Sequence, residues 1–159
     1  MVDWTMKWST RRKRIFVLLI CLIIIVAAFG LYYYNAIHRL RFQLVDVGLG
    51  TVGLTSAEIK LTIEVQNPNV LPIHIPSIDF DVYVNNQRLA NGYTGAFTVG
   101  GSSRQSVIVS VTFAYTDIAM TIVNLITGGG TVTVKAEGSA NFFLFGVPFS
   151  TTLYDAKFT

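Results

Sequence analysis

The sequence of 159 residues is poor in the residue types that build cross-links, metal sites and charged surfaces. It has one cysteine and two histidines, and 13% of its residues are charged, against roughly a quarter in an average globular protein. A single cysteine, Cys21, excludes an intrachain disulfide. With His38 and His74 far apart in sequence and no thiol beside either, a transition-metal site or a Cys/His nucleophile pair is not expected. We therefore predict no catalytic residue, no cofactor and no metal ion.

Positive charge is scarce beyond the first quarter of the chain. Residues 1–38 carry five Lys or Arg against one Asp, whereas the remainder carries seven against eight acidic residues. Nucleic-acid-binding domains need a basic patch or stripe. Since the later part of the chain has no positive surplus, we predict no nucleic-acid partner.

One long apolar run stands out near the N-terminus. Residues 15–34 carry no charge, and as a helix they would span ~30 Å, the thickness of a hydrocarbon core. The run predicts a single-pass span of a cell membrane, in contact with lipid, with the N-terminus cytoplasmic and the later domain extracytoplasmic. The residues that predict this orientation are the preceding basic cluster and an aromatic band at the far end: Arg11, Arg12, Lys13, Arg14, Tyr32, Tyr33 and Tyr34.

A cleaved signal peptide has similar ingredients and stays open as an alternative. An uncleaved signal anchor is favoured, because the run is longer than an ordinary signal-peptide core and no polar Ala-x-Ala site follows it. The predicted organisation is a cytoplasmic tail (1–14), a transmembrane anchor (15–37), a connector with the first strand (38–55) and a β-domain (56–159).

The β-domain shows a two-residue alternation of apolar and polar side chains. It is clearest in SAEIKLTIEVQ (56–66) and IDFDVYV (78–84), and it predicts one buried and one solvated face. Asn85-Asn86 predicts a tight hairpin turn. With segments near 42–47, 87–95, 106–113, 131–141 and 147–158, this makes seven strands, which indicates an all-β antiparallel sandwich.

A single short helix is predicted between two of these strands. Thr116 and Asp117 are suitable capping residues, and the three glycines at 128–130 would end the helix. The side chains expected on its buried stripe are Ile118, Ile122, Leu125 and Ile126.

Three prolines interrupt the strand pattern after residue 66. Pro68 cannot donate to a sheet ladder, and its asparagine neighbours favour turn conformations, so the Asn-Pro-Asn tripeptide should end one strand at a corner. Two further prolines should confine the next stretch to an edge or a crossover between sheets. The residues predicted to form this corner, which we expect to present a surface, are Asn67, Pro68, Asn69, Pro72 and Pro76.

This corner, the LPIHIPSI segment that follows it (71–78), Gly92 in the returning strand and the later FGVPF (145–149) resemble a known family. The chain is similar to the group-2 late embryogenesis abundant proteins with their water-stress and hypersensitive-response domain. In layout it resembles the membrane-anchored harpin-induced-like proteins. The resemblance implies a seven-stranded, fibronectin-III-like sandwich with one helix. It also implies a non-catalytic role in desiccation or stress protection, or in contacts at a cell envelope.

Several residue patterns have an ordinary structural interpretation beside a chemical one. Asp79 and Asp81 share a strand face and could bind calcium or act in acid–base catalysis, but a solvated sheet face is favoured because no ligand loop accompanies them. GLGTVG (48–53) lacks the Lys-Ser/Thr of a phosphate loop and is interpreted as a turn. His74, Ser102-Ser103 and Ser139 have no partner that the sequence identifies.

One aromatic cluster would matter if it were exposed. FFLFGVPF (142–149) either folds onto the core through a hairpin, which is favoured, or forms an apolar contact patch for lipid or a partner subunit. The residues of this possible patch are Phe142, Phe143, Phe145 and Phe149.

These observations favour a non-enzymatic, membrane-anchored interaction or stress-protection module whose partners are proteins or envelope components. The alternative is an accessory structural subunit of a larger membrane complex, with Ala27, Ala28 and Gly30 available for helix packing. A hydrolase that uses Asp79 ranks last. The oligomeric state is left open.

Overall fold

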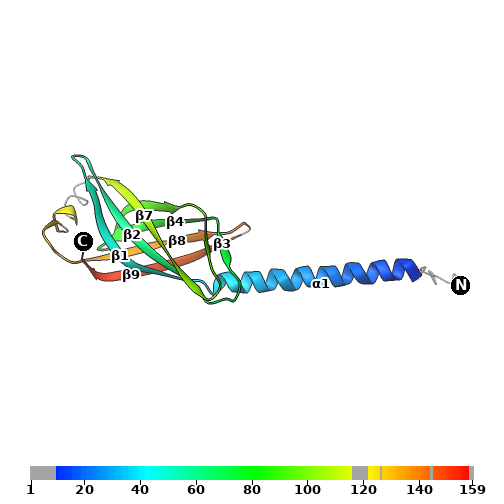
Figure 1. The fold of residues 1–159 in the computed structure, drawn as a ribbon. Helices are drawn as coiled ribbons and strands as arrows, with labels where there is room; N and C mark the ends of the chain where they lie inside the picture. Colours follow the sequence, from blue (N-terminus) through cyan, green and yellow to red (C-terminus); the bar gives the residue numbers. More distant parts are fainter. Residues whose placement is uncertain (1–9, 116–121, 126, 144, 158–159) are drawn as a thin grey trace. The chain divides into compact units, whose positions relative to one another are not determined.

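The computed structural model describes residues 10–115, 122–125, 127–143 and 145–157 (Figure 1). The chain divides into two compact units, residues 1–38 and residues 39–159. The first unit contains the helix α1 (Thr10–His38). The second unit, residues 39–159, is called the β-domain from here on; it contains the strands, and 57% of the chain is in strand.

Helix α1 has the properties of a candidate membrane span. Its segment Lys13–His38 is long and apolar enough to cross a bilayer, and every residue from 15 to 34 is exposed. A helix that is apolar on all sides is stable either inside a large core or in lipid. By length and composition α1 is a candidate for a membrane span or for a signal sequence near the N-terminus.

The second unit is built from antiparallel sheets. Its strands are β1 (Arg41–Val52), β2 (Ser56–Asn67), β3 (Ile73–Ile75), β4 (Ser77–Val84), β5 (Gln87–Thr94), β6 (Phe97–Val99), β7 (Ser103–Ala114), β8 (Val132–Asn141) and β9 (Gly146–Ala156). One sheet has the order β1-β2-β7, a second has the order β5-β4-β8-β9, and β3 pairs with β6 alone. The two larger sheets lie against each other, with β1 beside β9 and β5 beside β7 (Figure 1).

The core lies between the two larger sheets and follows the predicted alternation. On β2 the buried side chains are Ala57, Ile59, Leu61, Ile63 and Val65, and on β4 they are Ile78, Phe80, Val82 and Val84. Each buried branched side chain contributes roughly 1.5–3 kcal/mol relative to exposure. The predicted buried faces of both strands are therefore confirmed.

The structure has nine strands among the described residues, not seven. The additional two, β3 and β6, have three residues each and form their own small sheet. Pro72 and Pro76 flank β3, and since proline cannot donate to a ladder, the strand cannot lengthen in either direction. The segment thus crosses from the sheet of β2 to the sheet of β4.

The interpretation of residues 48–53 as a turn was wrong. Strand β1 continues to Val52, with Gly48 paired to Lys60 and Leu49 paired to Ile59. The long neighbouring strand β2 offers backbone partners along this whole stretch, and those hydrogen bonds outweigh the low strand preference of glycine. The turn follows at residues 53–55, where Gly53 N donates to Ser56 O at 2.8 Å.

The described part of the short helix covers residues 122–125 and 127. Thr116, Asp117, Ile118 and Ile126 lie outside the described residues. Ile122 is buried as predicted, but Leu125 is 41% exposed and Val123 is buried in its place. Gly129 ends the helix with φ of 79°, and Gly130 N donates to Leu125 O at 2.9 Å. This left-handed terminus is a common use of glycine.

Candidate functional site

The Asn-Pro-Asn corner is held together by the side chain of Asn67, which is 0% exposed. Its Nδ2 lies within hydrogen-bond distance of three carbonyl oxygens, those of Leu71 (2.9 Å), Gly100 (3.0 Å) and Val99 (3.2 Å). Its Oδ1 accepts from Asn69 N at 3.0 Å and Asn69 Nδ2 at 2.9 Å. One side chain therefore connects the end of β2, the following loop and the turn before β7.

The backbone of this corner packs closely against the turn at residues 100–102. Ser102 N donates to Asn69 O at 2.7 Å, and a Cβ placed on Gly101 would lie 1.8 Å from Val70 O. Both polar groups of the Asn67 side chain are used inside the protein. The corner is thus a structural clip: its two asparagines are buried, whereas Pro68, Pro72 and Pro76 are exposed, and a contact surface at this corner stays a prediction.

The outer face of the four-stranded sheet carries the two aspartates predicted as a possible acid pair. Arg88 binds Asp81 Oδ1 through Nη2 at 2.7 Å and Nε at 3.0 Å, and this hydrogen bond raises the pKa of Arg88. Asp79 accepts from Asn141 Nδ2 instead. Each carboxylate has a different basic or amide partner, so the two do not converge on one ligand. Among the described residues no three His, Cys, Asp or Glu side chains could hold a metal ion together.

A second ion pair continues this face along β8. Lys135 Nζ pairs with Glu137 Oε1 and lies 5.8 Å from the ring centre of Tyr83. Ser150 Oγ donates to Glu137 Oε1 at 3.2 Å. The hydrogen bond from Lys135, and then that from Ser150, lower the pKa of Glu137 below its usual value. Glu137 is consequently an ionised structural group at neutral pH, not a proton donor.

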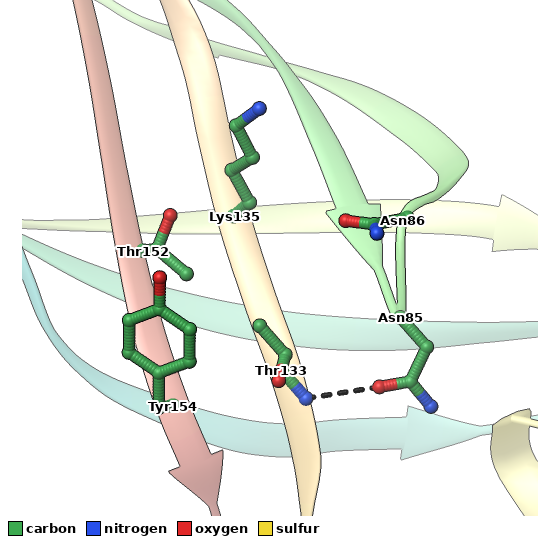
Figure 2. Close-up of a pocket in the computed structure, with 6 residues that line it drawn as sticks. All are labelled: Asn85, Asn86, Thr133, Lys135, Thr152 and Tyr154. Carbon is green, nitrogen blue, oxygen red and sulfur yellow. Dashed lines mark hydrogen bonds between the residues drawn. The ribbon is translucent and has the colours of Figure 1, made fainter.

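A polar cleft of about 530 Å³ opens on this face, at the end where β4 turns into β5 (Figure 2). Its lining residues come from the β4–β5 turn, β8 and β9: Asn85, Asn86, Thr133, Lys135, Thr152 and Tyr154. Figure 2 shows the two asparagines on one side of β8, and Thr152 and Tyr154 on the other. The lining offers amides, hydroxyl groups, one ammonium group and one aromatic ring.

The predicted Asn85-Asn86 turn builds one wall of this cleft. Both residues have positive φ, 50° and 66°, as a tight two-residue hairpin requires. The turn is fixed to β8 from both directions, because Asn85 N donates to Thr133 O at 2.9 Å and Thr133 N donates to Asn85 Oδ1 at 3.0 Å. The cleft can bind a polar ligand by hydrogen bonds, and the described residues of its lining include no carboxylate, imidazole or thiol.

Sequence reasoning did not find this cleft. The alternation places Thr133 with Lys135, and Thr152 with Tyr154, on outward strand faces. This pattern was the part of the cleft lining that the sequence could indicate. The missing information was the pairing of β4 with β8, which brings the Asn85-Asn86 turn beside these residues.

His74, Ser102 and Ser103 are not among the described residues that line the cleft. His74 is on β3 with Nδ1 3.1 Å from Thr98 Oγ1. Ser102 occupies a turn with φ of 50°, and Ser103 Oγ donates to Gly100 O at 2.8 Å. These contacts are local and stabilise turns and strand ends.

The four phenylalanines of the possible contact patch are divided between the core and the surface. Phe142 is buried, with its ring centre 6.0 Å from that of Phe145, and Phe149 stacks on Phe42 at 4.8 Å. Phe143, in contrast, is 97% exposed. Phe142 N donates to Phe145 O at 2.9 Å, so a tight turn points Phe143 outward.

A family model described as late embryogenesis abundant protein matches residues 62–153. The match covers more than half of the chain and includes β2 from its middle, the corner, most of β9 and the cleft lining except Tyr154. The chain belongs to the late embryogenesis abundant protein family. This family is generally non-enzymatic, which agrees with the paired carboxylates on the outer sheet face.

One solved structure among those compared shows a fold similar to that of this late embryogenesis abundant protein. A protein from Arabidopsis thaliana, solved in solution, is 16% identical, with a TM-score of 0.55, and the match covers 74% of this chain and 83% of that one. A protein from Archaeoglobus fulgidus is 19% identical over 69% of this chain and 92% of that one, with a TM-score of 0.47. No curated protein matches the sequence.

Proposed function

We propose that the chain is a non-enzymatic, membrane-anchored interaction or stress-protection module that displays a fibronectin-III-like sandwich outside the membrane. The observation that carries the proposal is the exposed apolar surface of α1, followed within two residues by the β-domain. Membership in the late embryogenesis abundant protein family supports the stress-related part. Within the family, the corner motif and the layout favour the group-2, water-stress and hypersensitive-response type and a harpin-induced-like arrangement.

The polar face of the four-stranded sheet supports a role in binding partners, not a role in catalysis. On this face Arg88 pairs with Asp81 and Lys135 pairs with Glu137, whereas the cleft at its end presents hydroxyl and amide groups on a rigid frame. A rigid frame lowers the ordering cost of binding. We infer that envelope components or protein partners bind at this cleft and that dehydration is one condition under which such contacts protect the cell.

The proposed topology can be tested by cysteine labelling of intact cells. In a Cys21→Ser background, Leu54→Cys places a thiol at a 99% exposed position of the β-domain, and Thr10→Cys places one before the apolar run. A membrane-impermeant maleimide should label Leu54→Cys in intact cells and Thr10→Cys only after lysis. The reverse pattern would refute the proposed orientation, and labelling of both without lysis would refute the membrane span.

The proposed contact surface can be tested on the intact protein extracted from its native membrane. Thr152→Ala and Tyr154→Ala should reduce the recovery of co-purifying envelope components. Thr112→Ala, an exposed strand position on the other large sheet, is the matched control and should leave recovery unchanged. Equal recovery in all variants would exclude the cleft. Stoichiometric recovery of other membrane subunits, unaffected by the cleft variants, would favour the alternative of an accessory subunit.

A further inference from the structure

Exposed apolar side chains occur at both ends of the β-domain: Phe143, Val70 and Leu71 lie at one end, and Val52, Leu54 and Tyr154 lie at the other. Phe143 is 97% exposed at the β8–β9 turn, and Val70 is 82% exposed in the loop after the Asn-Pro-Asn corner, next to the half-exposed Leu71. Leu54, which is 99% exposed, belongs to the β1–β2 turn. These side chains are outside the core, so burial within the domain does not account for them.

Strand pairing places Phe143, Val70 and Leu71 at the end where the chain enters the domain. Arg41, the first residue of β1, pairs with Gln66, directly before the corner. Phe42 stacks on Phe149, and Leu44 N donates to Thr151 Oγ1 at 2.9 Å, so β1 and β9 run side by side in the same direction. The starts of β1 and β9, and with them the β8–β9 turn, therefore share one end. We call Val70, Leu71 and Phe143 the entry-end patch; Leu54 lies at the opposite end.

The short connection to α1 limits how far this end can be from a membrane that α1 spans. Residues 15–34 fill the hydrocarbon core, and the four helical residues to His38 add ~6 Å, about the depth of one headgroup layer. From His38 to Arg41 the chain can extend by at most ~11 Å. Whatever the tilt of the domain, its entry end is held close to the lipid headgroups.

We propose that the entry-end patch docks on the bilayer surface and that lipid is its partner. Phe143, Val70 and Leu71 insert among the headgroups and upper acyl chains, while the exposed Arg39 and Arg41 contact anionic lipid phosphates. This inference rests on the proposed function, since it requires α1 to span the membrane. The docked domain then directs its opposite end, with the polar cleft, away from the lipid toward other envelope components.

The two tryptophans of the sequence, Trp4 and Trp8, precede α1, so the β-domain can carry a single introduced reporter. In the full-length chain with Trp4→Phe and Trp8→Phe, the reporter is Phe143→Trp or Val70→Trp, and the matched control is Leu54→Trp. Each variant is reconstituted in vesicles of phosphatidylcholine and phosphatidylglycerol, with and without lipids brominated high on the acyl chain. Circular dichroism verifies that each variant is folded.

We expect the emission of Phe143→Trp and Val70→Trp to shift to shorter wavelength in vesicles and to be quenched by the brominated lipids. Leu54→Trp should keep the emission of an indole in water. Unquenched emission from the two entry-end reporters in a chain that resists alkaline extraction overturns the inference alone and leaves the patch to a protein partner. Equal quenching of all three reporters would indicate non-specific adsorption of the domain to lipid and would also overturn the inference. Extraction of the chain by alkali refutes the membrane span and both proposals with it.

Discussion

Replacing Asn67 by leucine tests whether the corner is a structural clip, because leucine has the same branching at Cγ and removes every hydrogen bond of the side chain. Five hydrogen bonds involve this side chain, and three of them, the one to Val99 O and those from Asn69 N and Asn69 Nδ2, are buried. A buried backbone group that loses its partner costs ~1–2 kcal/mol, whereas the carbonyls of Leu71 and Gly100 are partly buried and can turn to water. We expect a loss of about 2–4 kcal/mol, a large fraction of the ~5–15 kcal/mol stability of an ordinary domain.

The assay is urea unfolding of the full-length protein in detergent, followed by far-UV circular dichroism in the region dominated by the strands. The control is Asn91→Leu, which makes the same exchange at an exposed position of β5 and should change stability by less than ~0.5 kcal/mol. If Asn67→Leu lowers the free energy of unfolding by no more than Asn91→Leu does, the hydrogen bonds of Asn67 do not stabilise the corner and the reasoning is wrong.

Asn67→Asp keeps the shape of the side chain, and pH then decides whether the new carboxyl group is protonated and can donate a hydrogen bond. The new carboxylate would be buried facing three carbonyl oxygens, so its pKa in the folded state should lie above the unfolded value of about 3.9. A group of this kind supports the fold below its unfolded pKa and loses that support as pH rises through the folded pKa. The variant should therefore be closest to wild type in acid and weakest at neutral pH. A stability difference independent of pH would contradict this placement of the side chain.

Three smaller effects can be measured with the same unfolding assay. Gly129→Ala should cost about 1 kcal/mol, because φ of 79° strains any residue with a Cβ, and hydrogen exchange should show the loss near residues 122–130. Arg88→Ala should lower the free energy of unfolding only slightly, because its ion pair with Asp81 is exposed, and the effect should shrink further in high salt. Glu137→Gln should flatten the acid limb of the stability profile: the folded pKa of Glu137 is lowered, so its contribution is present above the ordinary value of 4.5 and is lost as pH falls below it. An unchanged acid limb would show that the contacts with Lys135 and Ser150 do not persist in solution.

Much of the architecture could be predicted because it depends on neighbours in sequence. The alternation in β2 and β4, the apolar length of α1 and the Asn85-Asn86 turn all follow from side-chain periodicity and local backbone preference. The prediction was wrong where partners distant in sequence compete with local preference. Gly48–Val52 became strand because β2 lies beside it.

The candidate site depended even more on contacts that the sequence does not display. Thr133 and Tyr154 were visible as outward-facing residues, but only the pairing of β4 with β8 places the Asn85-Asn86 turn beside them. In the same way, four phenylalanines close in sequence could be recognised as a cluster, yet a one-residue difference in position separates the buried Phe142 from the exposed Phe143.

The sequence by itself determined the local secondary structure of this protein and its apolar pattern. It encodes an uncharged helix as long as a bilayer is thick, and strands with one apolar face each. These features need no distant partner, because a helix satisfies its own backbone and a strand face is set by every second residue. The tertiary structure alone decided which strands pair, where Asn67 finds its carbonyl partners and which aromatic side chain remains outside. Those outcomes arise from contacts between residues that the chain brings together only when the two sheets close on a common core.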